Sequence, residues 1–291
     1  MIDPQTALEP HEAPPHPPPH LRSQPWRARR RRSLRVLIEI VITLTVLTAA
    51  AEIILRIMDV KTFLVPKPTT VAQSFADNWY VLWTNSLVTL KEVVLGFLVA
   101  ASGGFLLAVV IVYVPVLSRI LYPLIVASQT IPKIAIAPLL IVWFGFGLAP
   151  KIIVVFLIAF FPVVIASTVG LRAVDENMLH LVRSMGASGL QAFYKVRLVN
   201  AVPSIFSGLK IAITLAVVGA IVGEFVGADA GLGYLLLIAN GQLDTALMFA
   251  AVVVLSIMGI VLFGIVSAVE QITPGHLRDQ AAAEEVSAGT L

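Results

Sequence analysis

The 291-residue sequence contains no cysteine and few charged residues. Without cysteine, the chain can form no disulfide and no thiolate metal site, and it has no cysteine nucleophile. Only 13% of its residues are charged and 58% are hydrophobic, whereas about 25% of the residues of a soluble domain are charged. This composition excludes a cytosolic enzyme, a disordered protein and an ordinary nucleic-acid-binding protein, and it predicts a polytopic membrane protein.

The sequence also lacks the motifs of common catalytic sites. It contains no G-x-x-x-x-G-K-[ST] phosphate loop, which excludes P-loop binding of ATP, and neither H-E-x-x-H nor G-x-S-x-G occurs. Beyond the first 25 residues the histidines are His180 and His276, and both lie near predicted polar segments. An intramembrane serine protease would need a histidine at membrane depth. We therefore expect no catalysis, no cofactor and no metal site in this chain.

The excess positive charge lies in one short segment. Residues 1–35 carry a net charge of +4 from seven arginines and three acidic residues, whereas the rest of the chain carries −1. Residues 1–25 also contain eight prolines and little that could be buried. We expect 1–35 to be a disordered, Pro/Arg-rich cytoplasmic tail held against anionic lipid. An uncleaved signal anchor follows, so 36–61 is predicted to be an N-terminal transmembrane helix with its outer flank.

The long apolar runs predict an all-α fold, a polytopic membrane bundle of about six transmembrane helices. The predicted spans are 36–55, 88–112, 131–148, 151–171, 207–227 and 246–269. Basic residues in the polar interval 172–206 place it, like the arginine-rich tail, in the cytoplasm. An even number of spans must then separate the two, so 120–148 crosses once and the part before Pro132 is interfacial or a broken half-helix. Both termini, including a tail at 271–291, are predicted to be cytoplasmic in a multi-pass inner-membrane protein.

Two predicted spans carry small residues at four-residue spacing. One stripe comprises Gly96, Ala100, Gly104 and Ala108, and the other comprises Gly219, Gly223 and Gly227. Such stripes allow helix backbones to approach closely in lipid, either in ordinary packing or around a pathway. Glu224 lies within the second stripe. A carboxylate at this depth either lines a solute path or pairs with a neighbouring helix.

The interval 172–206 is patterned as two short helices rather than as a plain connector. Apolar residues recur at helical spacing, and the pattern is interrupted at Gly186. We expect a turn at Gly186 that shapes a compact amphipathic pair on the cytoplasmic face. Pro203 is taken as the start of the next span. An amphipathic pair of this kind either lies on the membrane or docks into a groove of a partner.

This interval and its surroundings resemble the inner-membrane permease subunits of binding-protein-dependent ABC importers. The resemblance covers about 62–270, and it rests on MGAS at 185–188, FYKVRL at 193–198, AVPSI at 201–205, LVPKP at 64–68, IPKIAIAPL at 131–139, WFGFG at 143–147 and GLGY at 231–234. In the family's cytoplasmic EAA loop, His180, Leu181 and Val182 would take the Glu-Ala-Ala positions and Gly186 the glycine. His180 stands where Glu is usual and Val199 where Pro is usual.

The resemblance implies a transport role and a set of partners. Residues 62–270 would form the permease domain, with 172–206 as its coupling loop. The implied contacts with a separate ABC ATPase subunit are His180, Leu181, Val182, Met185, Gly186, Ala187, Ser188, Val196 and Leu198. A periplasmic solute-binding protein would deliver the solute, and a second permease copy would complete the pathway.

The solute implied by the resemblance is small and either anionic or heteroaromatic, as for sulfonates, taurine, nitrate or precursors of thiamine and riboflavin. Two alternatives remain open at this point. One is an ion-coupled secondary transporter or channel, which would need paired intramembrane carboxylates. The other is an intramembrane enzyme, which the missing nucleophile–base pair disfavours.

Overall fold

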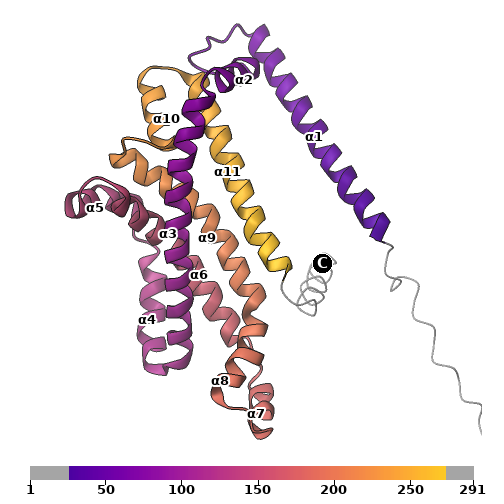
Figure 1. Ribbon diagram of the computed structural model, residues 1–291, viewed down its shortest axis with the longest axis vertical. Helices are drawn as coiled ribbons and strands as arrows, with labels where there is room; N and C mark the ends of the chain where they lie inside the picture. The colour runs from indigo at the N-terminus through magenta and orange to yellow at the C-terminus, as the bar shows by residue number, and fades with distance from the viewer. Residues whose placement is uncertain (1–25, 273–291) are drawn as a thin grey trace, which may run out of the picture. The chain divides into compact units, whose positions relative to one another are not determined.

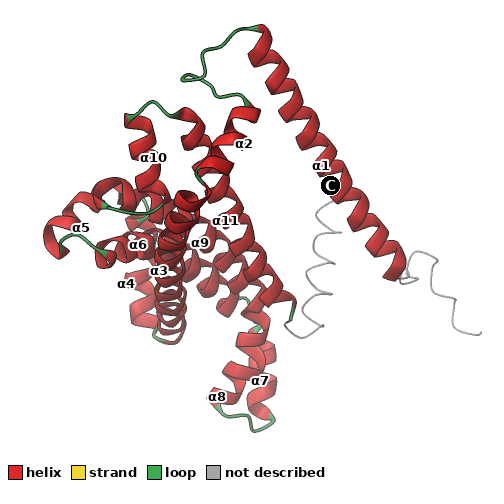
Figure 2. Cartoon of the chain, turned by 45° about the horizontal axis from the view of Figure 1, so that its top comes forward, coloured by secondary structure: helices red, strands yellow, loops and turns green. Residues whose placement is uncertain are grey.

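The computed structural model describes residues 26–272, except for the side chains of 26–37, 40 and 41. The described chain is helical and contains no strand (Figure 2). It divides into two units, residues 1–57 and 58–291, which are described separately. The predicted tail segments 1–25 and 273–291 lie outside the described residues.

The described part of the first unit is one helix, α1 (Trp26–Ile57). It begins ten residues before the predicted span, so the arginine run belongs to a helix and our placement of 26–35 in a disordered segment is wrong. No proline follows Pro25 in this stretch, and arginine favours helix, so nothing stops the helix from extending toward the N-terminus. Near its C-terminal end, Arg56 pairs with Glu52 one turn earlier at 2.8 Å.

Four long helices dominate the second unit: α3 (Trp79–Tyr113), α6 (Leu148–Arg172), α9 (Leu198–Gly227) and α11 (Thr245–Gln271) (Figure 1). Among the described residues these helices, with α9 counted from Gly189, are long and apolar enough to cross a membrane. They correspond to the predicted spans 88–112, 151–171, 207–227 and 246–269. The structure therefore confirms an all-α membrane bundle.

The two small-residue stripes hold α6 between α3 and α9. A Cβ atom added to Gly96 of α3 would lie 2.4 Å from the Cβ of Val155, and one added to Gly219 of α9 would lie 2.9 Å from the Cα of the same residue. Val155 is fully buried between them. Such approach is possible only without side chains, so the predicted close packing along both stripes is confirmed.

The third predicted span, 131–148, is not a single helix. The chain forms α4 (Pro115–Ser128), a 3₁₀ turn η2 (Lys133–Ile136) and α5 (Ala137–Phe144), and the two halves are bent by 86° across a short break. Pro132 and Pro138 lie at and just after this break, where their missing N–H groups prevent a continuous hydrogen-bond ladder. The predicted break at Pro132 is thus confirmed, whereas the single span predicted over 131–148 is wrong.

Two segments predicted to be loops form helices. These are α2 (Pro68–Asp77), between the predicted spans 36–55 and 88–112, and α10 (Leu232–Gly241), between the predicted spans 207–227 and 246–269; both intervals were expected to be loops. In α10, Leu232, Leu235, Leu236 and Ala239 are buried against the core of the bundle. Their spacing is that of one helix face, so the helix was visible in the sequence but was too short to count as a span.

Candidate functional site

At one end of the bundle, two short helices follow α6 and precede α9 (Figures 1 and 2). They are α7 (Glu176–Ser184) and α8 (Gly189–Ala192), followed by a π-helical turn, η3 (Phe193–Arg197), that runs into α9. We call residues 175–197 the knob. The predicted pair of short helices with a turn at Gly186 is confirmed.

Local capping builds the knob. The Asp175 carboxylate accepts the N–H of Asn177 at the start of α7. Gly186 has φ +85°, a region that favours glycine, and the N–H groups of Gly186 and Ala187 bond back to the carbonyls of Arg183 and Val182. This is a Schellman termination.

A capping box starts α8 two residues later. The Ser188 hydroxyl accepts the N–H of Gln191, and the Gln191 side chain accepts the N–H of Ser188. The break between the two helices is therefore specified by its own residues.

The knob carries an exposed apolar surface. Leu181 is 62% exposed, Met185 79% and Leu190 68%. Of the remaining predicted coupling residues, His180, Gly186 and Ser188 are also exposed, whereas Val182, Ala187 and Leu198 are half-buried. The structure thus places most of these residues on one accessible end of the protein.

Val196 differs from the other predicted coupling residues. It is buried with Val174 and Leu179 in a small cluster that holds the knob together. It therefore supports the exposed surface from beneath and is not itself accessible.

The predicted coupling loop also ends earlier than 206. α9 begins at Leu198 and contains Pro203, because Ala201 is fully buried with Ala108 and Leu171 and this packing extends the helix past the proline position.

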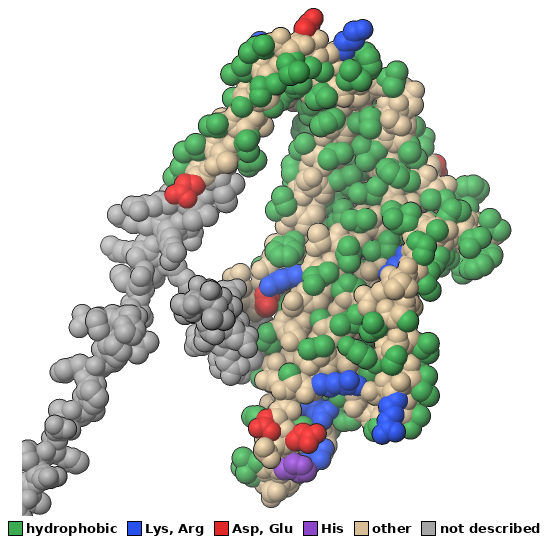
Figure 3. Space-filling view, turned by 180° about the vertical axis from the view of Figure 1, so that it is seen from behind, with side chains coloured by type: hydrophobic (Ala, Val, Ile, Leu, Met, Phe, Trp, Pro, Cys, Tyr) green, Lys and Arg blue, Asp and Glu red, His purple; other side chains and the backbone are tan. Residues whose placement is uncertain are grey.

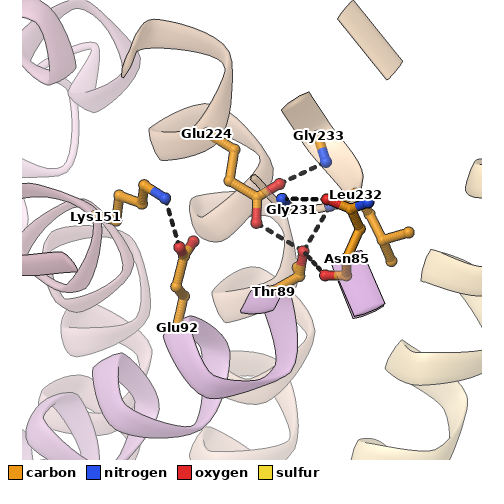
Figure 4. A network of polar contacts seen from close by, with 8 residues as sticks. All are labelled: Asn85, Thr89, Glu92, Lys151, Glu224, Gly231, Leu232 and Gly233. Atoms are coloured by element: carbon orange, nitrogen blue, oxygen red, sulfur yellow. Dashed lines mark hydrogen bonds and ion pairs between the residues drawn. The ribbon is translucent and has the colours of Figure 1, made fainter. Parts of the chain in front are cut away.

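At the opposite end of the bundle a buried polar network surrounds Glu224 (Figure 4). The Glu224 side chain is 1% exposed. Its carboxylate accepts the hydroxyl of Thr89 at 2.6 Å and the backbone N–H of Gly233. Glu224 comes from the end of α9, Thr89 from the first half of α3, and Gly233 from the first turn of α10.

This network binds the N-terminus of α10. The Thr89 hydroxyl oxygen accepts the N–H of Leu232 at 2.8 Å, and the Asn85 side-chain carbonyl accepts the N–H of Gly231 at 2.7 Å. With Gly233, three successive N–H groups are satisfied by side chains of α3 and α9 (Figure 4). Gly231 is required here: its φ is +119°, and an added Cβ would lie 2.2 Å from an oxygen of Glu224.

A buried ion pair lies beside the network. Lys151 Nζ of α6 is 2.7 Å from Glu92 Oε1 of α3, and their side chains are 6% and 1% exposed. The other oxygen of Glu92 has no hydrogen-bond partner in the described part of the chain. Four helices, α3, α6, α9 and α10, thus contribute to one polar cluster that connects them inside the bundle.

The cluster was largely missed from the sequence. The sequence suggested two roles for Glu224. The structure shows the first, pairing with neighbouring helices, whereas the second, contact with a solute, stays a prediction. Glu92 was not recognised, although it continues the Gly96 stripe one helical step earlier on the same face. Lys151, the first residue of the predicted span 151–171, was not recognised either, because its partner lies 59 residues away in sequence.

The described residues offer little chemistry beyond polar contacts. They contain no group of three or more His, Asp or Glu side chains placed to hold a metal ion. Two buried carboxylates are what an ion-coupled transporter would need, so the cluster alone does not separate that alternative from a permease.

Comparisons with known proteins distinguish a permease from an ion-coupled transporter. Residues 93–272 match the family model for the inner membrane component of binding-protein-dependent transport systems. A probable ABC transporter permease protein of Haemophilus influenzae is 38% identical over 69% of this chain and 82% of its own length. The formylaminopyrimidine transport permease protein ThiX of Halalkalibacterium halodurans is 34% identical over 72% of this chain and 84% of its own. The ion-coupled alternative is not favoured.

A solved structure has the same fold. The inward-facing MetNI methionine ABC transporter contains a chain that matches with a TM-score of 0.60 at 20% sequence identity. The match covers 68% of this chain and 98% of that one. The helices of the second unit are therefore arranged as in a chain of a known transporter.

Proposed function

The chain belongs to the family of binding-protein-dependent transport system inner membrane components, and from this premise we propose how it works as a permease subunit of an ABC importer. A periplasmic binding protein delivers the solute, two copies of this chain form the pathway, and a separate ATPase drives the conformational change. The ATPase acts on the knob, and the knob and both termini lie in the cytoplasm.

The exposed apolar surface of the knob carries this proposal. Leu181, Met185 and Leu190 are exposed among the polar and charged residues of the knob. Unless a partner covers them, these apolar side chains would be in contact with water. A helix pair with such a surface fits a groove in a partner. The caps at Asp175, Gly186 and Ser188 fix its shape in advance, which lowers the entropy lost on docking.

The distribution of charge supports a cytoplasmic knob. Because α6 leads into the knob and α9 leads out of it, the ends of α3, α6 and α9 near Tyr113, Arg172 and Leu198 share one side of the bundle. Basic residues in and next to this end are Arg119, Arg172, Arg183, Lys195, Arg197 and Lys210. Short segments rich in Lys and Arg stay in the cytoplasm.

The solute class that we propose is a small heteroaromatic or anionic molecule. Relatives named for formylaminopyrimidine and riboflavin transport are each 34% identical to this chain, whereas those named for aliphatic sulfonate transport in Bacillus subtilis and taurine transport in Escherichia coli are 29% and 28% identical. The names therefore favour a pyrimidine or flavin precursor over a sulfonate. A thermal-shift screen of the cognate binding protein against these classes tests the choice.

Site-directed cross-linking tests the contact with the ATPase. The chain has no cysteine, so a single introduced thiol is unique. In the assembled importer, Leu181→Cys should cross-link to the ATPase subunit, whereas Tyr80→Cys, exposed at the other end of α3, should not. Cross-linking to the ATPase from Tyr80→Cys, or its absence from Leu181→Cys, contradicts the proposal.

A further inference from the structure

Two arginines lie against the corner between α3 and α4, next to the knob. Arg172 is the last residue of α6, and Arg197 is the last residue of η3. The Arg172 guanidinium donates to the Ser118 hydroxyl and lies 5.5 Å from the centre of the Tyr122 ring. Arg197 lies 5.4 Å from the centre of the Tyr113 ring.

Packing beneath these arginines holds them in one place. Leu171 of α6 and Ala201 of α9, each close in sequence to one arginine, are buried in a cluster with Ala108 of α3. The Phe193 ring meets the Tyr113 ring edge-to-face at 5.8 Å. The ends of α3, α6 and α9 therefore converge, and both guanidinium groups face the same corner.

Neither arginine forms an ion pair with an acidic side chain among the residues that the structure describes. The ion pairs of the described residues join Glu52 with Arg56, Glu92 with Lys151 and Glu270 with Lys210, and none involves Arg172 or Arg197. A guanidinium has five N–H donors, and Ser118 takes one of those of Arg172. Arg119, exposed on α4, adds a third positive charge beside Ser118. Lys and Arg side chains gather near this end in Figure 3.

An exposed apolar stripe runs along the face of α4 that is turned away from Arg172, two residues out of phase with Ser118 and Tyr122. Val116, Ile120 and Leu124 follow one another at four-residue spacing along α4, and each is more than half exposed. Tyr113 is the last residue of α3, where tyrosines at a membrane surface are common. A basic cluster thus stands where α3 ends and α4 begins, at the level expected for lipid headgroups.

We propose that this corner binds an anionic phospholipid. Its phosphate accepts hydrogen bonds from Arg172 and Arg197. Arginines between membrane helices are suited to such headgroups because the guanidinium binds phosphate with paired donors. The Tyr122 and Tyr113 rings attract the guanidinium groups and help to hold them in place before the lipid arrives.

Lipid binding to the purified full chain tests the site. Native mass spectrometry from detergent measures binding of phosphatidylglycerol and, for comparison, of zwitterionic phosphatidylcholine. We expect Arg172→Gln/Arg197→Gln to weaken phosphatidylglycerol binding about tenfold or more without changing phosphatidylcholine binding. The matched control is Lys61→Gln/Lys67→Gln, which removes the same charge far from the corner and should leave phosphatidylglycerol binding unchanged.

A further variant identifies what is bound. Arg172→Lys/Arg197→Lys keeps the charge but loses the planar paired donors. Although the charge is unchanged, this variant should bind phosphatidylglycerol more weakly than the natural chain. The proposal is overturned if the glutamine variant binds phosphatidylglycerol normally, if the control loses as much, or if millimolar inorganic phosphate displaces the lipid, since the corner would then be a phosphate site.

Discussion

Replacing Lys151 with methionine should destabilise the protein, because Glu92 would remain buried without its partner. The two side chains are 6% and 1% exposed, and their charged atoms are 2.7 Å apart. Removing one member of such a pair costs about 3–5 kcal/mol, far more than loss of an exposed pair. Methionine keeps the aliphatic stem that packs against Gly223, where an added Cβ would lie 3.4 Å from the Cβ of Lys151.

The double variant Glu92→Met/Lys151→Met separates this effect from simple loss of contacts. Removing both charges also removes the unpartnered oxygen of Glu92. Replacing a buried pair by apolar residues is often neutral or stabilising. We therefore expect the double variant to lie within about 2 kcal/mol of the natural chain, with a coupling energy of about 3 kcal/mol or more.

Unfolding in micelles by titration with dodecyl sulfate, followed by tryptophan fluorescence, measures these free energies. Lys91→Met is the matched control, since Lys91 is adjacent to Glu92 on α3 but exposed, and its removal should change stability by no more than about 0.5 kcal/mol. If the losses of the two single variants simply add in the double variant, the ion pair does not connect α3 to α6 and the reasoning is refuted.

Three glycine substitutions test other parts of the structure. Gly186→Val forces a β-branched residue to φ +85° and should abolish ATP-driven uptake in proteoliposomes while membrane insertion is retained; normal uptake would argue against the role of the knob. Gly231→Ala places a methyl group against Glu224 and should lower the free energy of unfolding by about 1–3 kcal/mol, whereas Gly241→Ala, where space is open, should not. Gly96→Ala should cost about 1–3 kcal/mol because of the Val155 side chain, and it should cost less in a Val155→Gly background, where the opposing Cβ is absent; an equal cost in both backgrounds would contradict the close packing.

The bundle was predictable because its packing signals are local. A run of about 20 apolar residues identifies a span, and Gly96 and Gly104 mark the face of α3 that packs closely. The bend between α4 and α5 was harder, because prolines indicate a break without giving its angle. α10 was missed because a ten-residue apolar helix cannot be told from a loop by length, although the burial of Leu232 and Leu235 follows a helical period.

The knob and the polar cluster also differ in how far they could be predicted, because one is local in sequence and the other is not. The knob could be predicted because Gly186 and the apolar residues around it lie in one short interval. The polar cluster could not, because its members come from four helices. Assessing each charge within its own span gave Glu224 two possible functions, and only the folded chain shows that Thr89 and Gly233 are its partners.

The helix that leaves the knob has a consequence for how the ends of the protein communicate. Residues 189–227 are helical without interruption, so α8, η3 and α9 extend for about 58 Å at 1.5 Å per residue. Leu190 lies near the start of this helix and Glu224 near its end. A partner that displaced the start of this helix would therefore move the cap of α10 through one continuous element, in which the π-helical turn and Pro203 are the points most able to bend.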